Sequence, residues 1–419
     1  MEKFIGFTQA LELTFSRIEM PATEYVSLDG LAGRVLAADI AAKVDSPSVN
    51  ASLKDGFAVQ SADLRHADEA NPVSLEIAGS ATAGRISDAG VSRGKTVRIT
   101  TGAAIPDGAD AVLSEEFTNR DGPAVVCCNT AEPGRNVLAR GTDIRAGEIV
   151  ARQSERVSPA MVGLMATAGL DGAEVFKTPV ACVMATGDEV VAPGRPLPPG
   201  KLYASNITEI CAWLTHYRIP SHVAYAGDAK AETVAAINQW LEQVDVFISS
   251  GGVWGSEKDI MIAVLESLGW NGIYHRVRMG PGKAVAFGLL KGKPFFCLPG
   301  GPPSNEMAFL QIALPGILKM AGWPHLPFPK LSARLETPVR GNKDWTQFIH
   351  ARLERGQKGF SVTPLKQRSR LQSMARKNAL IVIPEGCDAF QADEVLEVQL
   401  LNNDVLYERS PEYYNGRRG

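Results

Sequence analysis

Three short polar turns in this sequence contain residue types that suit the binding of an anion. Each turn follows an apolar run, and the three are Thr186-Gly187-Asp188-Glu189, Ser250-Gly251-Gly252 and Pro299-Gly300-Gly301-Pro302. Glycine lets the backbone approach a phosphate without a Cβ in the way, and helices that start at such turns point unpaired N–H groups at bound anions. A single turn of this kind is usually only a turn, but three within about 120 residues favour one shared anion-binding crevice.

The elements that must position these turns alternate along the chain between strands and helices. Apolar runs before the turns predict strands, and the predicted helices are Ile207 to His216, Ala231 to Leu241, Asp259 to Leu268 and Ser304 to Met320. This alternation is typical of a doubly wound α/β layer. The carboxyl ends of its parallel strands meet at one edge, so we expect the three turns to lie there together.

Two other regions read as β-rich, because short apolar runs alternate with Gly, Pro, Asp and Asn. The strands predicted in these regions are Val73 to Ala78, Thr96 to Ile99, Ala111 to Leu113, Ala124 to Cys127, Leu331 to Leu335, Gln347 to Leu353, Ala379 to Ile383 and Val395 to Leu400. Further helices are predicted at residues 5 to 18, from Tyr25 to about Ala42, and from Ser158 to Ala168. The sequence therefore predicts a multidomain chain of α/β and β parts.

Composition excludes several classes of protein. The 419 residues include 43 basic and 46 acidic side chains, which gives no general attraction to nucleic acid. No run approaches the roughly 20 apolar residues of a membrane span, and the N-terminus lacks a secretory signal, so a cytoplasmic protein is expected. Six cysteines without CxxC spacing and six scattered histidines give no zinc pattern.

Several motifs in order resemble the molybdopterin molybdenumtransferase family, which comprises the bacterial MoeA proteins and the animal gephyrin E domain. They are Ser52-Leu-Lys-Asp-Gly-Phe-Ala-Val59, Arg98-Ile-Thr-Thr-Gly-Ala-Ala-Ile-Pro106, Gly108-Ala-Asp-Ala-Val112, Gly141-Thr-Asp-Ile-Arg-Ala-Gly147, Ala185-Thr-Gly-Asp-Glu189, Ser205-Asn206, Ser250-Gly-Gly-Val-Trp-Gly-Ser-Glu-Lys-Asp259, Met279-Gly-Pro-Gly-Lys283 and Leu298-Pro-Gly-Gly-Pro302. Their order and spacing extend the resemblance over nearly the whole chain.

The resemblance implies an elongated homodimer of four-domain subunits. Its molybdopterin-binding α/β domain would comprise residues 1–25 and 178–327, and a linking domain would comprise 26–46 and 141–177. An inserted β-rich domain at 47–140, a C-terminal β domain at 328–408 and a tail at 409–419 complete the expected division. The cleft of each subunit would be completed by the inserted domain of its partner.

The implied reaction inserts molybdate into the dithiolene of adenylylated molybdopterin, with release of AMP and of the metal that occupied the dithiolene. Mg²⁺ would bridge phosphate oxygens and take hard carboxylate ligands, for which Glu189 and Asp259 are the candidates. The acids expected to act in catalysis are Asp55, Asp143, Glu189 and Asp259. The residues expected to bind substrate are Thr101, Thr186, Gly187, Asp188, Ser250, Gly251, Gly252, Lys283, Pro299, Gly300, Pro302 and Ser304.

Simpler roles stay open for several of these residues. Asp55 and Asp143 are also suited to brace turns, and Asp259 to favour a helix N-terminus. Lys283 suits a phosphate or molybdate ion, but it equally suits the surface of a hairpin. Ser304 is expected to cap the helix at the third turn, to contact phosphate, or both.

The sequence also departs from the family pattern. Uncharged residues replace cations at Leu138 and Gly280, and further departures are Asn50-Ala51, Lys54, Gly301, Pro303, Gln347, His350 and Lys377. Each lost charged contact costs about 1.5–3 kcal/mol of binding where it is desolvated. The nearby cations that are candidates to restore the charge are Lys54, Arg135, Arg140 and Arg278.

Three functions follow from the resemblance and its departures. The first is a working metal insertase, supplied by a molybdopterin adenylyltransferase or serving a molybdoenzyme partner. The second is a divergent paralogue that carries molybdopterin or inserts a different oxyanion such as tungstate. The third is a non-catalytic scaffold that binds partner peptides.

Overall fold

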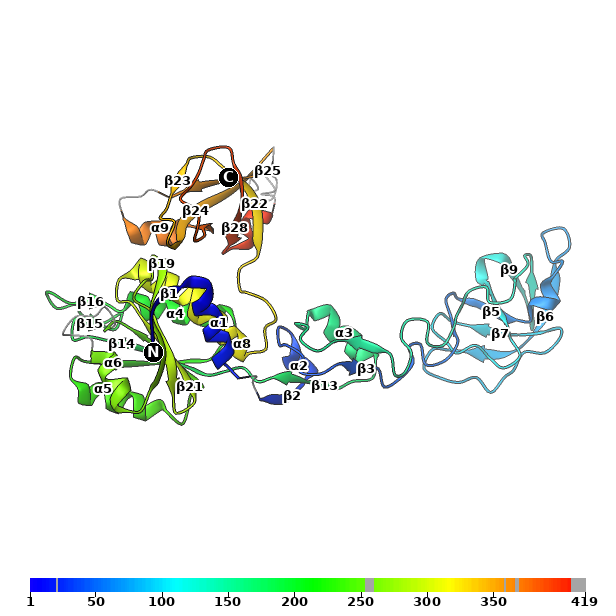
Figure 1. The fold of residues 1–419 in the computed structure, drawn as a ribbon. Helices are drawn as coiled ribbons and strands as arrows, with labels where there is room; N and C mark the ends of the chain where they lie inside the picture. Colours follow the sequence, from blue (N-terminus) through cyan, green and yellow to red (C-terminus); the bar gives the residue numbers. More distant parts are fainter. Residues whose placement is uncertain (20–21, 253–259, 358, 366–368, 408–419) are drawn as a thin grey trace. The chain divides into compact units, whose positions relative to one another are not determined.

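The computed structural model describes residues 1–19, 22–252, 260–357, 359–365 and 369–407. The chain forms two compact units (Figure 1). One comprises Met1–Ala22 and Phe176–Gly419, and the other comprises Thr23–Val175. Within the described ranges, no helix has the length and apolar character needed to cross a membrane.

The first unit is built on a parallel sheet that follows the predicted strands. In spatial order its parallel strands are β17 (Ser221–Ala226), β14 (Ala181–Thr186), β18 (Val246–Ser250) and β21 (Lys293–Leu298). The sheet continues through the antiparallel strands β20 (Ala286–Leu290) and β19 (Asn271–Gly280), and β1 (Glu2–Gly6) runs parallel to β19. The parallel strands thus place the three polar turns at one edge, as predicted.

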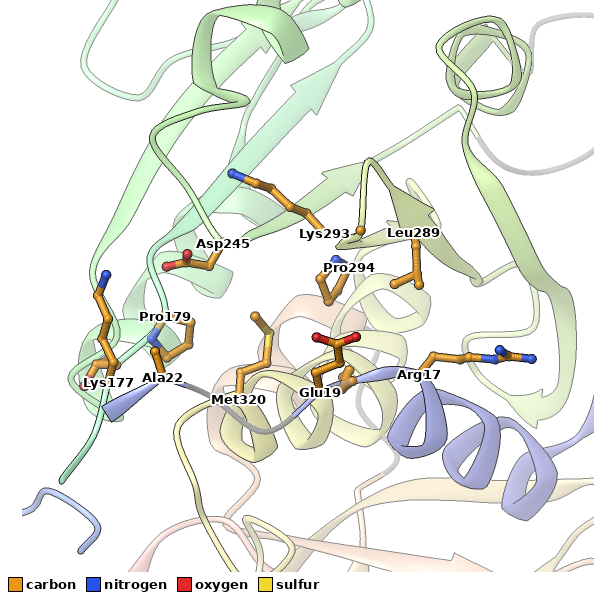
Figure 2. Close-up of a pocket in the computed structure, with 13 residues that line it drawn as sticks. Arg17, Glu19, Ala22, Lys177, Pro179, Asp245, Leu289, Lys293, Pro294 and Met320 are labelled. Carbon is orange, nitrogen blue, oxygen red and sulfur yellow. The ribbon is translucent and has the colours of Figure 1, made fainter. Parts of the chain in front are cut away.

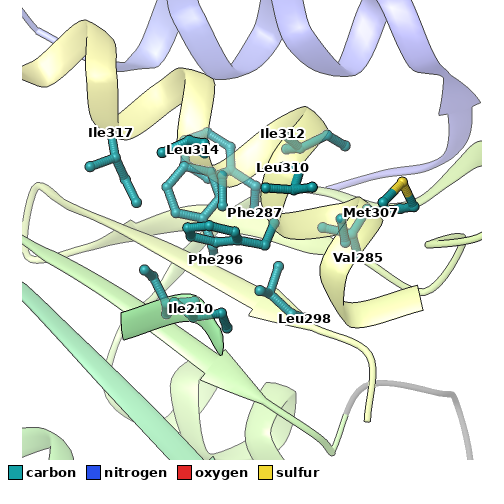
Figure 3. Packing of buried hydrophobic residues seen from close by; sticks show 14 of the residues in the cluster. Ile210, Val285, Phe287, Phe296, Leu298, Met307, Leu310, Ile312, Leu314 and Ile317 are labelled. Atoms are coloured by element: carbon teal, nitrogen blue, oxygen red, sulfur yellow. The ribbon is translucent and has the colours of Figure 1, made fainter. Parts of the chain in front are cut away.

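Helices cover both faces of this sheet. They are α1 (Phe7–Arg17), α4 (Ser205–His216), α5 (Lys230–Trp240), α6 (Ile260–Ser267), α7 (Pro302–Ala308) and α8 (Leu314–Met320). Successive residues of β18 show the two covered faces: Val246 and Ile248 pack in the core under α1, α4, α7 and α8, whereas Phe247 packs in the core under α5 and α6. Figure 3 shows the first core, where Phe287 and Phe296 stack against each other. The predicted doubly wound α/β layer is confirmed.

The helix predicted from Ser304 to Met320 begins earlier and contains a π-helical turn at Phe309–Ala313. The cause lies at Pro315, which has no N–H to donate to the carbonyl four residues before it. Leu314 donates its N–H to the carbonyl of Phe309, five residues back. The turn carries the buried side chain of Gln311, which exchanges two amide hydrogen bonds with Gln399, of 2.9 and 3.2 Å.

The C-terminal β domain has its own apolar core. Its main elements are β22 (Lys330–Leu335), β24 (Thr346–Gly356), β25 (Gly359–Pro364), α9 (Arg370–Arg376), β26 (Ala379–Ile383) and β28 (Val395–Leu400). The strands predicted in this region are therefore confirmed. The domain continues the sheet of the α/β layer through parallel pairing of β24 with β19, where Gly280 lies beside Gln347.

The second unit contains the predicted β-rich region. Its six-stranded sheet has the order β8 (Ala111–Ser114), β5 (Gly56–Val59), β7 (Lys95–Ile99), β6 (Val73–Ala81), β10 (Ala124–Cys127) and β9 (Thr118–Asp121). The segments that flank this sheet in sequence pair with each other: β2 (Thr23–Ser27) with β13 (Gly172–Phe176), and β3 (Ile40–Ala41) with β12 (Ile149–Ala151). The predicted helix near Ser158 is α3 (Pro159–Thr167).

The helix predicted from Tyr25 to Ala42 is wrong. Only α2 (Leu28–Leu31) is helical there, between β2 and β3. Two glycines weaken the segment as a helix, because glycine at position 30 has a low helix propensity and Gly33 has a φ of +86°, which is not helical. Pairing with β13 then supplies hydrogen bonds that outweigh the local helical periodicity. The opening helix also begins later than predicted, at Phe7, because Glu2–Gly6 extends the sheet.

Candidate functional site

The ends of β14 and β18 and the turn after β21 line one cavity of about 220 Å³. Its lining includes six of the residues predicted from sequence: Thr186, Glu189, Ser250, Gly251, Gly300 and Pro302. The remaining walls come from the start of α4 and from the short pairing of β15 (Val190–Val191) with β16 (Leu202–Tyr203). The structure therefore brings the three polar turns together, as the crevice hypothesis requires.

The hydroxyl of Ser250 connects the second turn to two asparagines that also bind the third turn. It accepts hydrogen bonds from the side-chain amides of Asn206, at 3.1 Å, and Asn305, at 3.0 Å. The same two amides donate to the carbonyls of Gly300 and Pro299, both at 2.8 Å. Sequence reasoning assigned no site role to either asparagine, and their position at the start of helices after the turns was the available signal. Together they fix the second turn against the third.

The first turn is fixed to the second through Thr186, whose hydroxyl donates to the carbonyl of Ser250 at 3.1 Å. This contact requires glycine at position 251, which has a φ of +106° and where a Cβ would lie 2.9 Å from the Thr186 hydroxyl. Gly187 is favoured by its backbone, since its φ of +121° is one that residues with a side chain rarely adopt. The glycines therefore allow the first and second turns to pack closely against neighbouring groups of the site.

The two predicted acids of the first turn have different surroundings. Glu189 lines the cavity, whereas Oδ1 of Asp188 accepts the N–H of Asp228 at 3.1 Å. Asp259, the other expected metal ligand, lies outside the described residues. Among the residues that are described, no set of three or more His, Cys, Asp or Glu side chains gathers as a metal site would require. The described part of the chain thus supplies one of the two carboxylates predicted for Mg²⁺.

Ser304 is not the cap of the helix at the third turn. The N-cap of α7 is Gly301, and Pro302 occupies the first helical position, where its missing N–H costs no hydrogen bond. Ser304 lies in the first turn of the helix and is partly exposed. Its capping role is therefore wrong, and the contact with phosphate stays a prediction.

Lys283 sits in an aromatic environment that the sequence did not indicate. Its ammonium lies 5.2 Å from the ring centre of Phe4 and 5.3 Å from that of Trp345, within the range of cation–π attraction. The two rings meet edge to face, with centroids 5.5 Å apart. Lys283 is not among the residues that line the 220 Å³ cavity.

The second unit contains the other predicted site residues. Thr101 donates its backbone N–H to Oδ1 of Asp55 at 2.7 Å and its hydroxyl to the same atom at 3.2 Å. Asp143 is exposed, and its backbone N–H donates to the carbonyl of Ser46 at 2.9 Å. The structure therefore brings Asp55 and Thr101 together and gives Asp143 a bracing backbone contact.

Three of the four cations considered as replacements already have partners. Arg135 donates to the carbonyl of Thr130 at 2.7 Å, and Arg140 pairs with Asp45 at 2.5 Å. Arg278 pairs with Glu385 at 3.4 Å and donates to the carbonyl of Phe4 at 3.1 Å. Among the four, exposed Lys54 is the one whose ammonium has no hydrogen bond or ion pair with any residue that the structure describes.

A larger cavity, of about 310 Å³, lies at the opposite edge of the α/β sheet (Figure 2). Its lining includes Arg17, Lys177, Asp245 and Lys293, but none of the predicted site residues. Lys293 and Asp245 are engaged by backbone groups, since Lys293 donates to the carbonyl of Val244 at 2.7 Å and Asp245 accepts the N–H of Val180 at 2.8 Å. Chemistry and geometry therefore favour the smaller cavity as the functional site.

Three family models match successive parts of the chain. The model described as "MoeA N-terminal region (domain I and II)" matches residues 5–169, and that described as "Probable molybdopterin binding domain" matches residues 182–319. The model described as "MoeA C-terminal region (domain IV)" matches residues 332–401. The second match contains every residue that lines the 220 Å³ cavity.

Relatives are similar over almost the full length of the chain. Molybdopterin molybdenumtransferase 2 of Mycobacterium tuberculosis is 31% identical over 380 residues, covering 89% of this chain and 94% of its own. Molybdopterin molybdenumtransferase of Bacillus subtilis is 29% identical over 391 residues, covering 91% of this chain and 90% of its own. The crystal structure of a molybdopterin biosynthesis MoeA protein from Pyrococcus horikosii superposes with a TM-score of 0.84 at 30% identity, covering 95% of this chain and 99% of its own. The chain therefore belongs to the molybdopterin molybdenumtransferase family, whose bacterial members are the MoeA proteins.

Proposed function

We propose that this protein inserts molybdate into adenylylated molybdopterin and releases AMP. The observation that carries the proposal is Ser250, whose hydroxyl and backbone carbonyl together join three polar turns around one cavity, within the segment that matches the molybdopterin-binding model. The relatives described above match this chain over most of their length, and both are named molybdopterin molybdenumtransferases. The four-domain division predicted from sequence remains part of the proposal.

The residues of the chain suit the work of binding and orienting an anionic pterin. Backbone N–H groups at the glycine turns and at the start of α7 offer donors to phosphate oxygens. Lys283 supplies a cation whose aromatic neighbours limit its rotation without neutralising its charge. Phosphoric anhydride chemistry depends mainly on positioning and charge neutralisation, so a few acids and donors suffice. Asp55, Asp143, Glu189 and Asp259 are the acids proposed for it.

Magnesium belongs to the proposal as a bound ion. Carboxylate oxygens such as those of Glu189 are ligands that Mg²⁺ prefers, and when bound the ion would neutralise phosphate charge. The described residues do not by themselves complete such a site. No step of the proposed mechanism is therefore assigned to the ion, and omission of magnesium from the single-turnover assay tests whether the reaction requires it.

A homodimer is also proposed, in which the Asp55 and Thr101 pair of one subunit serves the pterin cavity of the other. Mixing two inactive variants tests it: Asp55→Asn and Glu189→Gln subunits would restore activity when combined if each site draws on both subunits. A cytoplasmic location fits the six free cysteines, since thiols stay reduced there. A molybdopterin adenylyltransferase is the proposed donor of the substrate.

A single-turnover assay tests the activity. Purified protein, adenylylated molybdopterin, magnesium and molybdate are mixed, and both AMP and molybdenum bound to the recovered cofactor are measured. AMP that depends on molybdate and is lost in Asp259→Ala and Glu189→Gln supports the proposal. Glu19→Gln, at the opposite edge of the sheet, is the matched control and keeps full activity.

Two observations favour a second function. Gly280 stands where the family pattern has a lysine, so that cation is missing. Three of the cations that could replace the lost charges, Arg135, Arg140 and Arg278, are already bound to other groups of the protein. A chain with fewer free cations would hold the pterin as a carrier or accept tungstate. Binding of the pterin without AMP release, with either oxyanion present, would select the carrier function over the insertase.

A further inference from the structure

A buried ion pair joins the α/β layer to the C-terminal β domain. It is formed by Glu306 of α7 and Lys377, which directly follows α9, and their side chains are 1% and 5% exposed. Nε2 of His350, on β24, lies 3.2 Å from the other carboxylate oxygen of Glu306. The ammonium of Lys377 also donates to the carbonyl of Met374 in the last turn of α9, at 2.8 Å. One buried carboxylate of the α/β layer therefore meets two segments of the C-terminal domain.

Two positions at which the sequence departs from the family pattern meet at this carboxylate. His350 and Lys377 are distant in sequence, but β24 pairs with β26 so that His350 lies opposite Leu380. This pairing brings the residues just before β26 to the same end of α7 as His350. The two departures are therefore parts of one set of contacts, and both bear on how α7 is held.

The helix that carries Glu306 also carries an amide that binds Ser250. Asn305 directly precedes Glu306 on α7, and the residue is 1% exposed. Its side-chain amide donates to the Ser250 hydroxyl at 3.0 Å and to the carbonyl of Pro299 at 2.8 Å. Neighbouring residues of a helix point about 100° apart, so Asn305 faces the polar turns while Glu306 faces the C-terminal domain. The two side chains thus fix α7 from two directions.

The start of α7 depends on these side chains for its position. Its first two residues are Pro302 and Pro303, which have no N–H to donate, and Gly301 at the N-cap has no side chain that could cap the helix. A buried ion pair is sensitive to geometry, because a buried charge that loses its partner is strongly destabilising. The pair of Glu306 and Lys377 therefore restricts where the first turns of α7 can lie.

We propose that Lys377 is a positioning residue of the pterin cavity, which acts through Glu306 and Asn305 on the second and third turns. The C-terminal domain holds α7 in the place where one amide of Asn305 reaches both Ser250 and Pro299. The consequence for pterin binding rests on the proposed function, whereas the effect on the turns does not.

Two variants separate the orientation of α7 from the stability of the fold. Glu306→Leu with Lys377→Met replaces the ion pair by apolar side chains, which restore burial but do not fix a direction, because apolar attraction is non-directional. Glu306→Gln keeps the length of the native side chain and removes its charge. Lys330→Met is the matched control, since it loses only an exposed pair with Glu397 in the same domain.

Hydrogen exchange of the ligand-free, full-length protein measures the effect on the turns. The amide of Gly251 donates to the carbonyl of Leu298 at 3.0 Å, so its protection reports the contact between the second turn and β21. Both variants should lower this protection by roughly 2- to 30-fold, as expected for residues that couple separate parts of a protein. The amides of β14, inside the same sheet, should change less, and Lys330→Met should leave both unchanged.

Titration of the same proteins with adenylylated molybdopterin measures the consequence for the cavity. Both variants should bind it more weakly than the wild type and the control, even where the double variant is as stable as the wild type. The inference is overturned if Gly251 keeps its wild-type protection in either variant, if β14 loses protection equally, or if pterin binding is unchanged in both. A wild-type protein that does not bind the pterin would contradict the proposed function and leave the exchange result unaffected.

Discussion

Thr101 directs two donors, its backbone N–H and its hydroxyl, at a single oxygen of Asp55, at 2.7 and 3.2 Å. Both residues are exposed, so this arrangement does not serve a hydrophobic core. The two hydrogen bonds to Oδ1 hold the carboxylate in one orientation. An exposed, oriented carboxylate is suited to act on a ligand, and that role can be separated from a simple turn role.

Asp55→Asn is the substitution that separates the two roles. Asparagine can still accept both hydrogen bonds through its side-chain oxygen, so the free energy of unfolding should change by less than about 0.5 kcal/mol. Loss of the charge should slow single-turnover AMP release by about a hundredfold if the carboxylate acts in the reaction. Urea denaturation and the release assay measure the two quantities. An unchanged rate would assign Asp55 to the turn alone.

Asn305 should be important for stability as well as for the pterin cavity. Its side chain is buried, and it makes hydrogen bonds to the Ser250 hydroxyl and to the carbonyl of Pro299. Asn305→Ala should lower the free energy of unfolding by about 1–3 kcal/mol, because buried partners lose their donor. In a double-mutant cycle with Ser250→Ala the losses should be less than additive. Exposed Asn119→Ala is the control, and additive losses would contradict the coupling.

Lys283 should contribute charge to substrate binding and packing to the fold. Lys283→Met keeps an unbranched chain against Phe4 and Trp345 but removes the ammonium, which should cost about 1 kcal/mol of cation–π attraction. Molybdate should bind at least about tenfold more weakly, as expected for a lost charged contact. Trp345→Leu keeps the charge and should affect molybdate binding less. Calorimetric titration with molybdate distinguishes the two, and equal losses would reject a direct contact of Lys283 with the anion.

Much of the fold was predictable because local periodicity and tertiary environment agree. The helix from Ser205 to His216 and the strands of the C-terminal domain have apolar faces that the structure buries. The helix predicted from Tyr25 to Ala42 is wrong for the opposite reason. There, backbone pairing with β13 competes with a helical pattern that Gly30 and Gly33 interrupt. The local pattern of one sequence does not reveal which distant strand a segment will pair with.

The sequence predicted the loops that form the site, but it did not predict the side-chain contacts that join them. Glycine turns after apolar runs located the cavity, because glycine is required where φ is positive and a neighbouring side chain is close. The amide contacts of Asn206 and Asn305 with Ser250 join residues 44 and 55 positions apart. The rings around Lys283 come from the N-terminal strand and the C-terminal domain. Only tertiary structure determines such partners.

The buried pair of Glu306 and Lys377 gives the last prediction. Lys377→Met leaves a buried carboxylate without its cation, which should lower the free energy of unfolding by about 3–5 kcal/mol. The double variant Glu306→Leu with Lys377→Met replaces the ion pair by apolar side chains, and its stability should return to within about 1 kcal/mol of the wild type. Exposed Lys330→Met, which loses only a surface pair with Glu397, is the matched control and should change stability by less than about 1 kcal/mol. Urea denaturation at pH 7 measures all four proteins. A double variant as unstable as Lys377→Met would show that the lysine stabilises the C-terminal domain by packing rather than by its charge on Glu306.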